Sequence, residues 1–199
     1  MKPITAILAT VAVLSIATAG RTEPLKPHLT PAGQIYGELK VTDSGAEKTL
    51  ADHVWKFWQT DGGRTLLWAG SDGAGGYENE GQSLWRYNSL TKRKRMLAAF
   101  VYTIHSVREA RSRSGKRGFV LTMFDGGLGA PHLAVVRDGG GVAWQKSVAR
   151  LAAIRNGRIA VAVMHTRDIP GTDDTSQVPV LRMIYRDLDA LLGGVSRVR

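Results

Sequence analysis

The stretch TDGGRTLLWAG, residues 60–70, consists of a tight turn followed directly by an apolar segment of strand length. Glycine suits turns because it has no Cβ, and a short apolar run bounded by turn residues is typical of a buried strand. A glycine-rich loop, a strand over residues 83–87, a polar turn and a short strand near residues 95–97 follow. Together with a strand candidate over residues 54–58, this segment predicts a four-stranded antiparallel unit.

The same order of elements returns twice along the chain. Strands are predicted over residues 104–107, 119–124 and 132–136 in the second unit, and over residues 148–151, 159–164 and 180–185 in the third. Each unit has a turn glycine followed ten or eleven residues later by a strand-ending aspartate; the glycines are Gly62, Gly115 and Gly157, and the aspartates are Asp72, Asp125 and Asp168. The glycines are 53 and 42 residues apart, a spacing typical of arrays of four-stranded blades.

An incomplete unit precedes the three full ones. Residues 33–41 and 48–50 can be aligned with the two outer strands of the first full unit. The sequence therefore predicts an all-β fold of antiparallel repeat units resembling propeller blades, about three and a half in number, with a twisted β-sandwich as the alternative. An unclosed array exposes sheet edges, so we expect an irregular blade or a second copy of the chain, in a homodimer, to cover them.

Two motifs of the first full unit carry a resemblance to a known repeat family. The turn and strand Asp61-Gly62-Gly63-Arg64-Thr65-Leu66-Leu67, followed by Leu84-Trp85-Arg86-Tyr87, resemble the WD-like, Asp-Gly type propeller repeats of bacterial envelope proteins. In the second unit Ser114-Gly115 replaces the Asp-Gly pair. The resemblance implies a propeller-like fold over most of residues 33–192, and it implies no particular activity.

The N-terminal segment has the layout of a secretory signal peptide. Lys2 precedes an apolar run from Ile4 to Ile16, and small residues follow at positions 17–19. We therefore expect residues 1–19 to be a cleaved signal peptide and the protein to be periplasmic or secreted. Residues 20–32 are expected to form a linker or an extended N-terminus, residues 33–192 a single β-repeat domain, and residues 193–199 a basic C-terminal tail.

The chain is strongly basic, with a formal net charge of +10 and no cysteine. Two predicted turns concentrate the cations, which are Lys92, Arg93, Lys94 and Arg95 in one and Arg111, Arg113, Lys116 and Arg117 in the other. Such turns are either solvated loop tips or an anion-binding surface. The partners expected for the second case are an anionic envelope polymer or a lipid surface, with another envelope protein as an alternative. Nucleic acid is disfavoured, because no nucleic-acid-binding motif is present.

The sequence contains no recognised nucleophile or metal-binding motif. Asp72, Asp125 and Asp168 are expected on one rim of the blades, where they either end strands or bind calcium, the one cofactor considered. His132, at the mouth of a loop, and Glu78 and Glu80, in the glycine-rich loop, are candidate ligand-binding residues. These observations favour an exported, non-catalytic binding or scaffold module. The alternative is an envelope hydrolase that uses rim carboxylates as acid and base.

Overall fold

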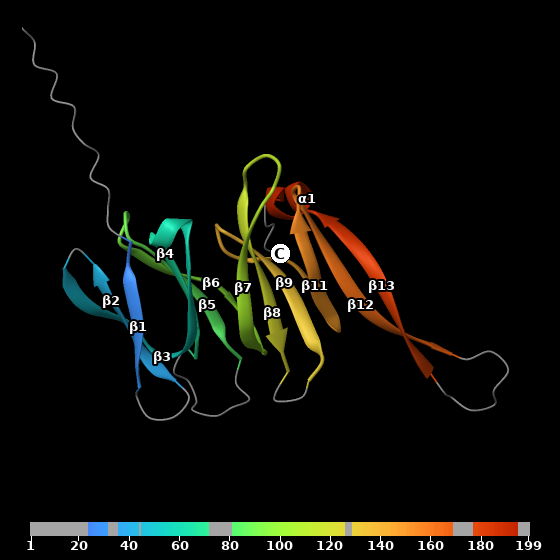
Figure 1. Ribbon diagram of the computed structural model, residues 1–199, viewed down its shortest axis with the longest axis horizontal. Helices are drawn as coiled ribbons and strands as arrows, with labels where there is room; N and C mark the ends of the chain where they lie inside the picture. The colour runs from blue at the N-terminus through green and yellow to red at the C-terminus, as the bar shows by residue number, and fades with distance from the viewer. Residues whose placement is uncertain are drawn as a thin grey trace, which may run out of the picture.

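A computed structural model of the 199-residue chain describes residues 24–31, 36–43, 45–71, 81–125, 129–168 and 177–194. Nearly all of these residues lie in antiparallel strands, which form a row of twisted sheets (Figure 1). The expected signal peptide, residues 1–19, lies outside the described residues, as do residues 195–199 of the expected tail. Among the described residues, no helix is long and apolar enough to span a membrane.

The first sheet contains six strands in chain order. They are β1 (Lys26–Pro31), β2 (Gly37–Asp43), β3 (Ala46–Thr60), β4 (Thr65–Gly70), β5 (Ser83–Asn88) and β6 (Arg93–Ala99), with a 3₁₀ turn, η1 (Asp61–Gly63), between β3 and β4. The N-terminal half of β3 pairs with β2 and its C-terminal half pairs with β4. The sheet therefore consists of an incomplete first blade (β1, β2 and the start of β3) and a four-stranded second blade (the end of β3, then β4, β5 and β6).

Two further sheets form the third and fourth blades. The third contains β7 (Thr103–Arg111), β8 (Arg117–Phe124), β9 (Pro131–Arg137) and β10 (Val142–Lys146). The fourth contains β11 (Ala149–Arg155), β12 (Arg158–Asp168) and β13 (Gln177–Asp187), followed by the short helix α1 (Leu188–Gly193). Asp187 caps the helix by accepting a hydrogen bond from the backbone N–H of Asp189.

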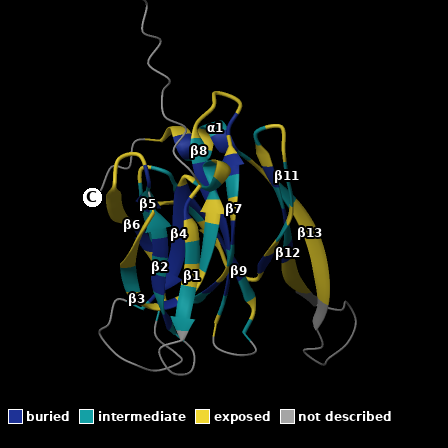
Figure 2. Ribbon diagram, turned by 60° about the vertical axis from the view of Figure 1, so that its left-hand side comes forward, coloured by how far each residue is buried: buried dark blue, intermediate teal, exposed yellow. Residues whose placement is uncertain are grey.

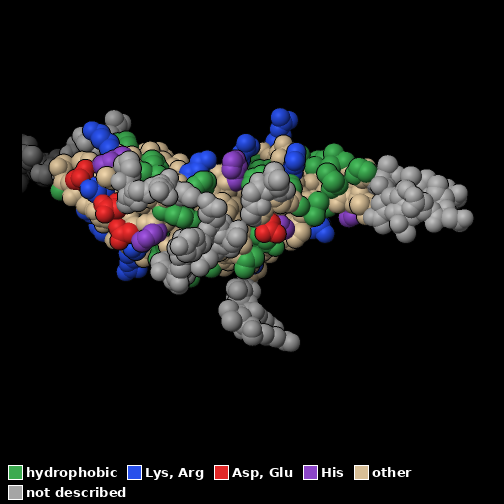
Figure 3. All heavy atoms as spheres, turned by 90° about the horizontal axis from the view of Figure 1, so that it is seen from below, with side chains coloured by type: hydrophobic (Ala, Val, Ile, Leu, Met, Phe, Trp, Pro, Cys, Tyr) green, Lys and Arg blue, Asp and Glu red, His purple; other side chains and the backbone are tan. Residues whose placement is uncertain are grey.

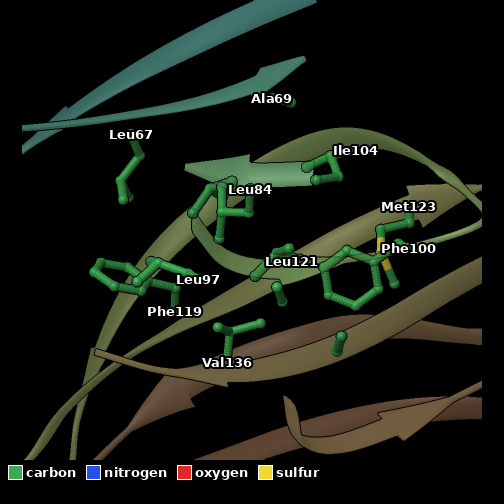
Figure 4. Packing of buried hydrophobic residues seen from close by; sticks show 13 residues of the cluster. Leu67, Ala69, Leu84, Leu97, Phe100, Ile104, Phe119, Leu121, Met123 and Val136 are labelled. Carbon is green, nitrogen blue, oxygen red and sulfur yellow. The ribbon is translucent and has the colours of Figure 1, made fainter. Parts of the chain in front are cut away.

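Successive blades bury apolar side chains between them. Figure 2 marks the buried residues in dark blue along the strands. Leu39, Val41 and Trp68 lie in the core between the first two blades. Leu84, Phe119 and Leu121 lie in the core between the second and third blades (Figure 4). Val135, Val161 and Leu188 lie in the core between the third and fourth blades. Strand alternation places these residues inward, so the stacking of faces stabilises the array.

The structure confirms the all-β fold of antiparallel blade-like units. It also differs from the expectation at two places. Strand β1 begins at Lys26, inside the segment expected to be a linker or extended N-terminus, and it pairs with β2. Pro27 and Pro31 argue against a strand in the sequence, because proline cannot donate a backbone hydrogen bond. They are tolerated here because β1 is an edge strand. In the fourth blade, α1 follows β13 where the repeat predicted a short strand.

Candidate functional site

A pocket of about 420 Å³ lies in the crease between the first and second blades. Its lining comes from β3, β4, β5 and β6 and from the residue that follows β4. The lining residues are Thr49, Leu50, Ala51, Asp52, His53, Trp68, Ser71, Trp85 and Lys94. Aromatic and aliphatic side chains surrounded by a few polar groups are the usual composition of a ligand site.

A sharp bend in β3 produces this crease. The pairing of β3 shifts register between Val54 and Lys56, and His53 has a φ of +53°. The carbonyl oxygen of His53 accepts a hydrogen bond of 3.1 Å from the N–H of Ser71. A Cβ on Gly70 would lie 2.8 Å from that same oxygen. The bend can therefore pass close over the end of β4 only because residue 70 is glycine.

Two stacked tryptophans form the aromatic part of the lining. Trp68 on β4 and Trp85 on β5 are direct cross-strand partners, with ring centroids 6.2 Å apart and planes 9° from parallel. Trp68 is buried, whereas Trp85 is half-buried. The ammonium group of Lys94 lies 5.5 Å from the centroid of the Trp85 ring and donates a 3.0 Å hydrogen bond to the Leu50 carbonyl. Lys94 thus ties β6 to β3 across the pocket and brings a positive charge to its edge.

A half-buried carboxylate fixes the hairpin of β2 and β3 that forms one side of this crease. Asp43 accepts hydrogen bonds from Lys92 at 2.6 and 2.8 Å, from Lys48 at 3.3 Å and from the Tyr87 hydroxyl at 3.1 Å. The hydrogen bond from Lys92, with those from Tyr87 and Lys48, lowers the pKa of Asp43 to about 2 although burial opposes the shift. We call Asp43, Lys48, Tyr87 and Lys92 the Asp43 cluster. It joins the first blade to the turn between β5 and β6.

The eight cations predicted to bind anions lie at the ends of two hairpins. In the first, Lys92 lies in the turn between β5 and β6, and Arg93, Lys94 and Arg95 begin β6. In the second, Arg111 ends β7, Arg113 and Lys116 lie in the turn, and Arg117 begins β8. Some of them are engaged within the protein. Lys92 belongs to the Asp43 cluster, Arg117 pairs with Asp138 at 3.0 Å, and Arg111 pairs with Glu109 at 2.6 Å. Lys94 lies at the pocket, and Arg113 donates to the carbonyl of Asn156 at 3.0 Å. Arg93, Arg95 and Lys116 have exposed side chains. An anion-binding surface across both turns stays a prediction.

His132, which the sequence analysis placed at the mouth of a loop, is the second residue of β9 and has 7% of its surface exposed. Its ring stacks on Tyr102, with centroids 3.8 Å apart and planes at 15°. Within the described part of the chain, its Nδ1 atom has no hydrogen-bond partner. The stack explains the position of the ring by packing and leaves its ligand-binding role a prediction.

The predicted acidic rim is described only in part. Asp125 is exposed after the end of β8, whereas Asp72, Glu78 and Glu80 lie outside the described residues, as does the side chain of Asp168 at the end of β12. No group of three or more metal-binding side chains occurs among the residues that the structure describes. Calcium binding therefore remains a prediction.

Comparison with known proteins supports the fold and leaves the family open. No protein-family model and no curated protein matches the chain. The structure is similar to the β-propeller domain of the Trilobed protease from Pyrococcus furiosus, described as having an open velcro topology, with a TM-score of 0.51 and 9% sequence identity. That match covers 82% of this chain and 53% of the other, so this chain spans about half of its length. A Pyrococcus horikoshii acylaminoacyl peptidase matches with a TM-score of 0.46 and 12% identity, over 75% of this chain and 28% of that one.

Proposed function

We propose that the protein is an exported, non-catalytic binding module whose pocket holds a sugar unit of an anionic envelope polymer. The observation that carries the proposal is that Trp85, stacked on Trp68, lines the pocket together with the Lys94 ammonium group, which lies 5.5 Å from the Trp85 ring centroid. The C–H bonds of a sugar ring carry slight positive charge and pack well on the electron-rich face of an indole. A carboxylate or sulfate on the same sugar would receive a charge-assisted hydrogen bond from Lys94.

The polar groups around the tryptophans support a sugar more than a lipid chain. Thr49, Asp52, His53 and Ser71 also line the pocket and bring hydroxyl, carboxylate and imidazole groups to it. A lipid chain would leave such groups without hydrogen bonds, at a cost of about 1–3 kcal/mol for each one that becomes buried. The hydrolase alternative depends on rim carboxylates, of which the structure describes the side chain of Asp125.

Titration of tryptophan fluorescence with an acidic polysaccharide tests this proposal. Polygalacturonate and heparin serve as ligands, and neutral dextran serves as the uncharged control. We expect Lys94→Gln to weaken binding of the acidic polymers by about fivefold to tenfold, which corresponds to about 1–1.4 kcal/mol. Trp85→Ala should weaken binding further and remove most of the fluorescence change, because Trp85 is the more exposed member of the stacked pair.

The neighbouring residue on β6 provides a matched control. Arg93 carries the same charge as Lys94 and is exposed, but it does not line the pocket. Arg93→Gln should therefore change affinity by less than about twofold, apart from the general effect of net charge. Equal losses in Lys94→Gln and Arg93→Gln would mean that the polymer binds a diffuse positive surface, and unchanged binding in Trp85→Ala would exclude the pocket.

The exported location rests on the N-terminal sequence pattern. Mass spectrometry of the protein expressed in a bacterium should find a mature chain that begins near Gly20 or Arg21. A mature chain that retains residues 1–19 would contradict export with cleavage.

A further inference from the structure

The two ends of the row of blades present opposite chemistry. On the first blade, strand alternation turns His28 of β1, Lys40 of β2 and Glu47 of β3 away from the second blade. His28 pairs with Glu47 at 3.5 Å, and Lys40 pairs with Glu38 of the same face at 3.7 Å. This end is charged and internally paired, which is the property of a terminal repeat that faces water.

The outer face of the fourth blade carries an apolar patch on β12 and β13, with Arg150 of β11 and the Arg158–Asp187 pair at its margins. On β12 and β13 the residues that face the third blade include Ile159, Val161 and Ile184. The intervening residues turn outward and lie opposite one another in register, as Ala160 with Tyr185, Ala162 with Met183, and Met164 with Leu181. We call these six residues the outer face. Figure 3 shows hydrophobic side chains gathered at this end of the molecule.

The large apolar side chains of the outer face are substantially exposed and lie next to one another. The exposed fraction is 66% for Leu181, 64% for Tyr185, 49% for Met164 and 41% for Met183. Contiguous exposed apolar patches mark interaction surfaces, whereas single exposed residues need no explanation. An apolar partner surface would remove these side chains from water.

We propose that two copies of the protein associate through their outer faces, in a two-fold dimer that places the fourth blades back to back. A two-fold contact joins the same patch on both copies, so an apolar face meets an apolar face. A head-to-tail contact would instead bury the charged face of the first blade, with Lys40 and Glu47, against Leu181 and Tyr185. Burying charges against apolar side chains costs free energy. Because the first-blade end is charged and the fourth-blade end is apolar, the two-fold arrangement is favoured over the head-to-tail one.

The size of the face fits a weak or moderate dimer. The paired segments of β12 and β13 each contain eleven residues. The third strand, β11, contains seven residues. At about 3.3 Å per residue, with strands about 4.8 Å apart, the three strands have a projected area of roughly 450 Å², to which the protruding side chains add. A standard interface removes about 800 Å² of accessible surface from each partner. We therefore expect a dissociation constant on the order of micromolar.

The edge of β13 is less suited to the contact than its face. Pro179 has no N–H to donate, and it lies in the strand opposite Thr166 of β12. The same strand carries Arg182 and Arg186, whose like charges would approach those of a second copy in an edge-to-edge sheet. Two sheets packed face to face avoid both problems.

Sedimentation velocity at protein concentrations from about 1 to 100 µM tests the dimer. We expect the dimer fraction to rise with concentration and with salt from about 0.1 to 0.5 M, because salt screens the repulsion between two strongly basic chains. Leu181→Glu should abolish the dimer. Leu90→Glu provides the matched control, since Leu90 is 54% exposed in the turn before β6, and it should leave the dimer unchanged.

A second variant tests the symmetry. The chain has no cysteine, so Met183→Cys introduces a single thiol near the centre of the outer face, where a two-fold axis brings two copies of one residue together. Oxidation should give a covalent dimer with Met183→Cys and none with Leu90→Cys. A monomer at the highest concentration, a dimer that survives Leu181→Glu, or equal cross-linking of the two cysteine variants would overturn the proposal.

Discussion

Replacement of Asp43 by asparagine tests how the first blade is held against the second. The Asp43 carboxylate has 11% of its side-chain surface exposed, and it accepts hydrogen bonds from two lysines and a tyrosine. An asparagine at this position would retain the shape of the side chain and lose its charge. The variant therefore removes the ion pairs of the Asp43 cluster while changing packing little.

The lowered pKa of Asp43 gives an upper limit for the loss of unfolding free energy in Asp43→Asn. A fall from 3.8 to about 2 corresponds to about 2.4 kcal/mol at about 1.36 kcal/mol per pKa unit. Lys92 and Lys48 have 51% and 41% of their side chains exposed, so water screens both pairs. We therefore expect the free energy of unfolding to fall by about 1 kcal/mol at pH 7. In a domain of this size that change lowers the melting temperature by about 2–4 °C.

The effect should depend on pH in a defined direction. Because the folded-state pKa of Asp43 is lowered, the charged carboxylate stabilises the protein above the unfolded-state pKa. That stabilisation is lost as pH falls through the folded-state value of about 2. Urea unfolding at pH 7, 4, 3 and 2 should show a difference between wild type and Asp43→Asn that is constant above about pH 5, shrinks at pH 4 and 3, and is mostly lost at pH 2.

Two further variants control this experiment. Glu47→Gln, in the same hairpin, should cost less than about 0.5 kcal/mol, because Glu47 and His28 are both about half exposed. A double-mutant cycle of Asp43→Asn with Lys92→Gln should give a coupling energy of about 0.5–1 kcal/mol. If Asp43→Asn is as stable as wild type at pH 7, or if the two stability curves stay parallel down to pH 2, the Asp43 cluster does not hold the blades together.

Four other outcomes are expected. Phe119→Ala should lower the unfolding free energy by about 3–5 kcal/mol in urea denaturation, because Phe119 is fully buried between blades; a loss below about 1 kcal/mol would contradict that packing. Gly81→Ala should abolish soluble expression, since its Cβ would lie 1.8 Å from the Phe100 carbonyl oxygen, whereas Gly139→Ala, with open space around it, should be neutral. Asp189→Asn should speed proteolysis near the C-terminus, because Asp189 accepts hydrogen bonds from the backbone N–H groups of Ser114 and Arg113 that anchor α1. An unchanged rate of cleavage would refute this anchoring. Calcium should raise the melting midpoint if the strand-ending aspartates bind it, and a midpoint unmoved at millimolar calcium would leave them as turn residues.

The repeat could be predicted because its signals are local. The turn glycines Gly62, Gly115 and Gly157 all adopt positive φ, at 60°, 83° and 71°. Residues with side chains rarely adopt that conformation, so the fold needs glycine at these turns, and the period becomes visible in the sequence. The apolar runs that follow the glycines are β4, β8 and β12, which supply buried residues to all three inter-blade cores.

The pocket could not be predicted because its contacts are long-range. Lys94 reaches the carbonyl of Leu50, 44 positions earlier in the chain, and Lys92 reaches Asp43, 49 positions earlier. The bend that brings them together depends on a register shift in β3, which has no local sequence signal. Counting charges along the chain therefore grouped Lys92 and Lys94 with the exposed Arg93, although the fold gives the two lysines separate contacts.

Strand β13 has apolar residues on both of its faces, although one of those faces is exposed. In β2 apolar and charged residues alternate strictly, with Leu39 and Val41 inward and Glu38 and Lys40 outward, as expected of a strand with one solvent-exposed face. In β13, by contrast, apolar residues occupy both faces: Ile184 packs toward the third blade, whereas Leu181 and Tyr185 turn outward. Apolar residues on both faces are typical of a strand that is covered on both sides. The outer face of the fourth blade thus has the composition of a buried surface, which is the physical reason to expect that a second protein surface covers it.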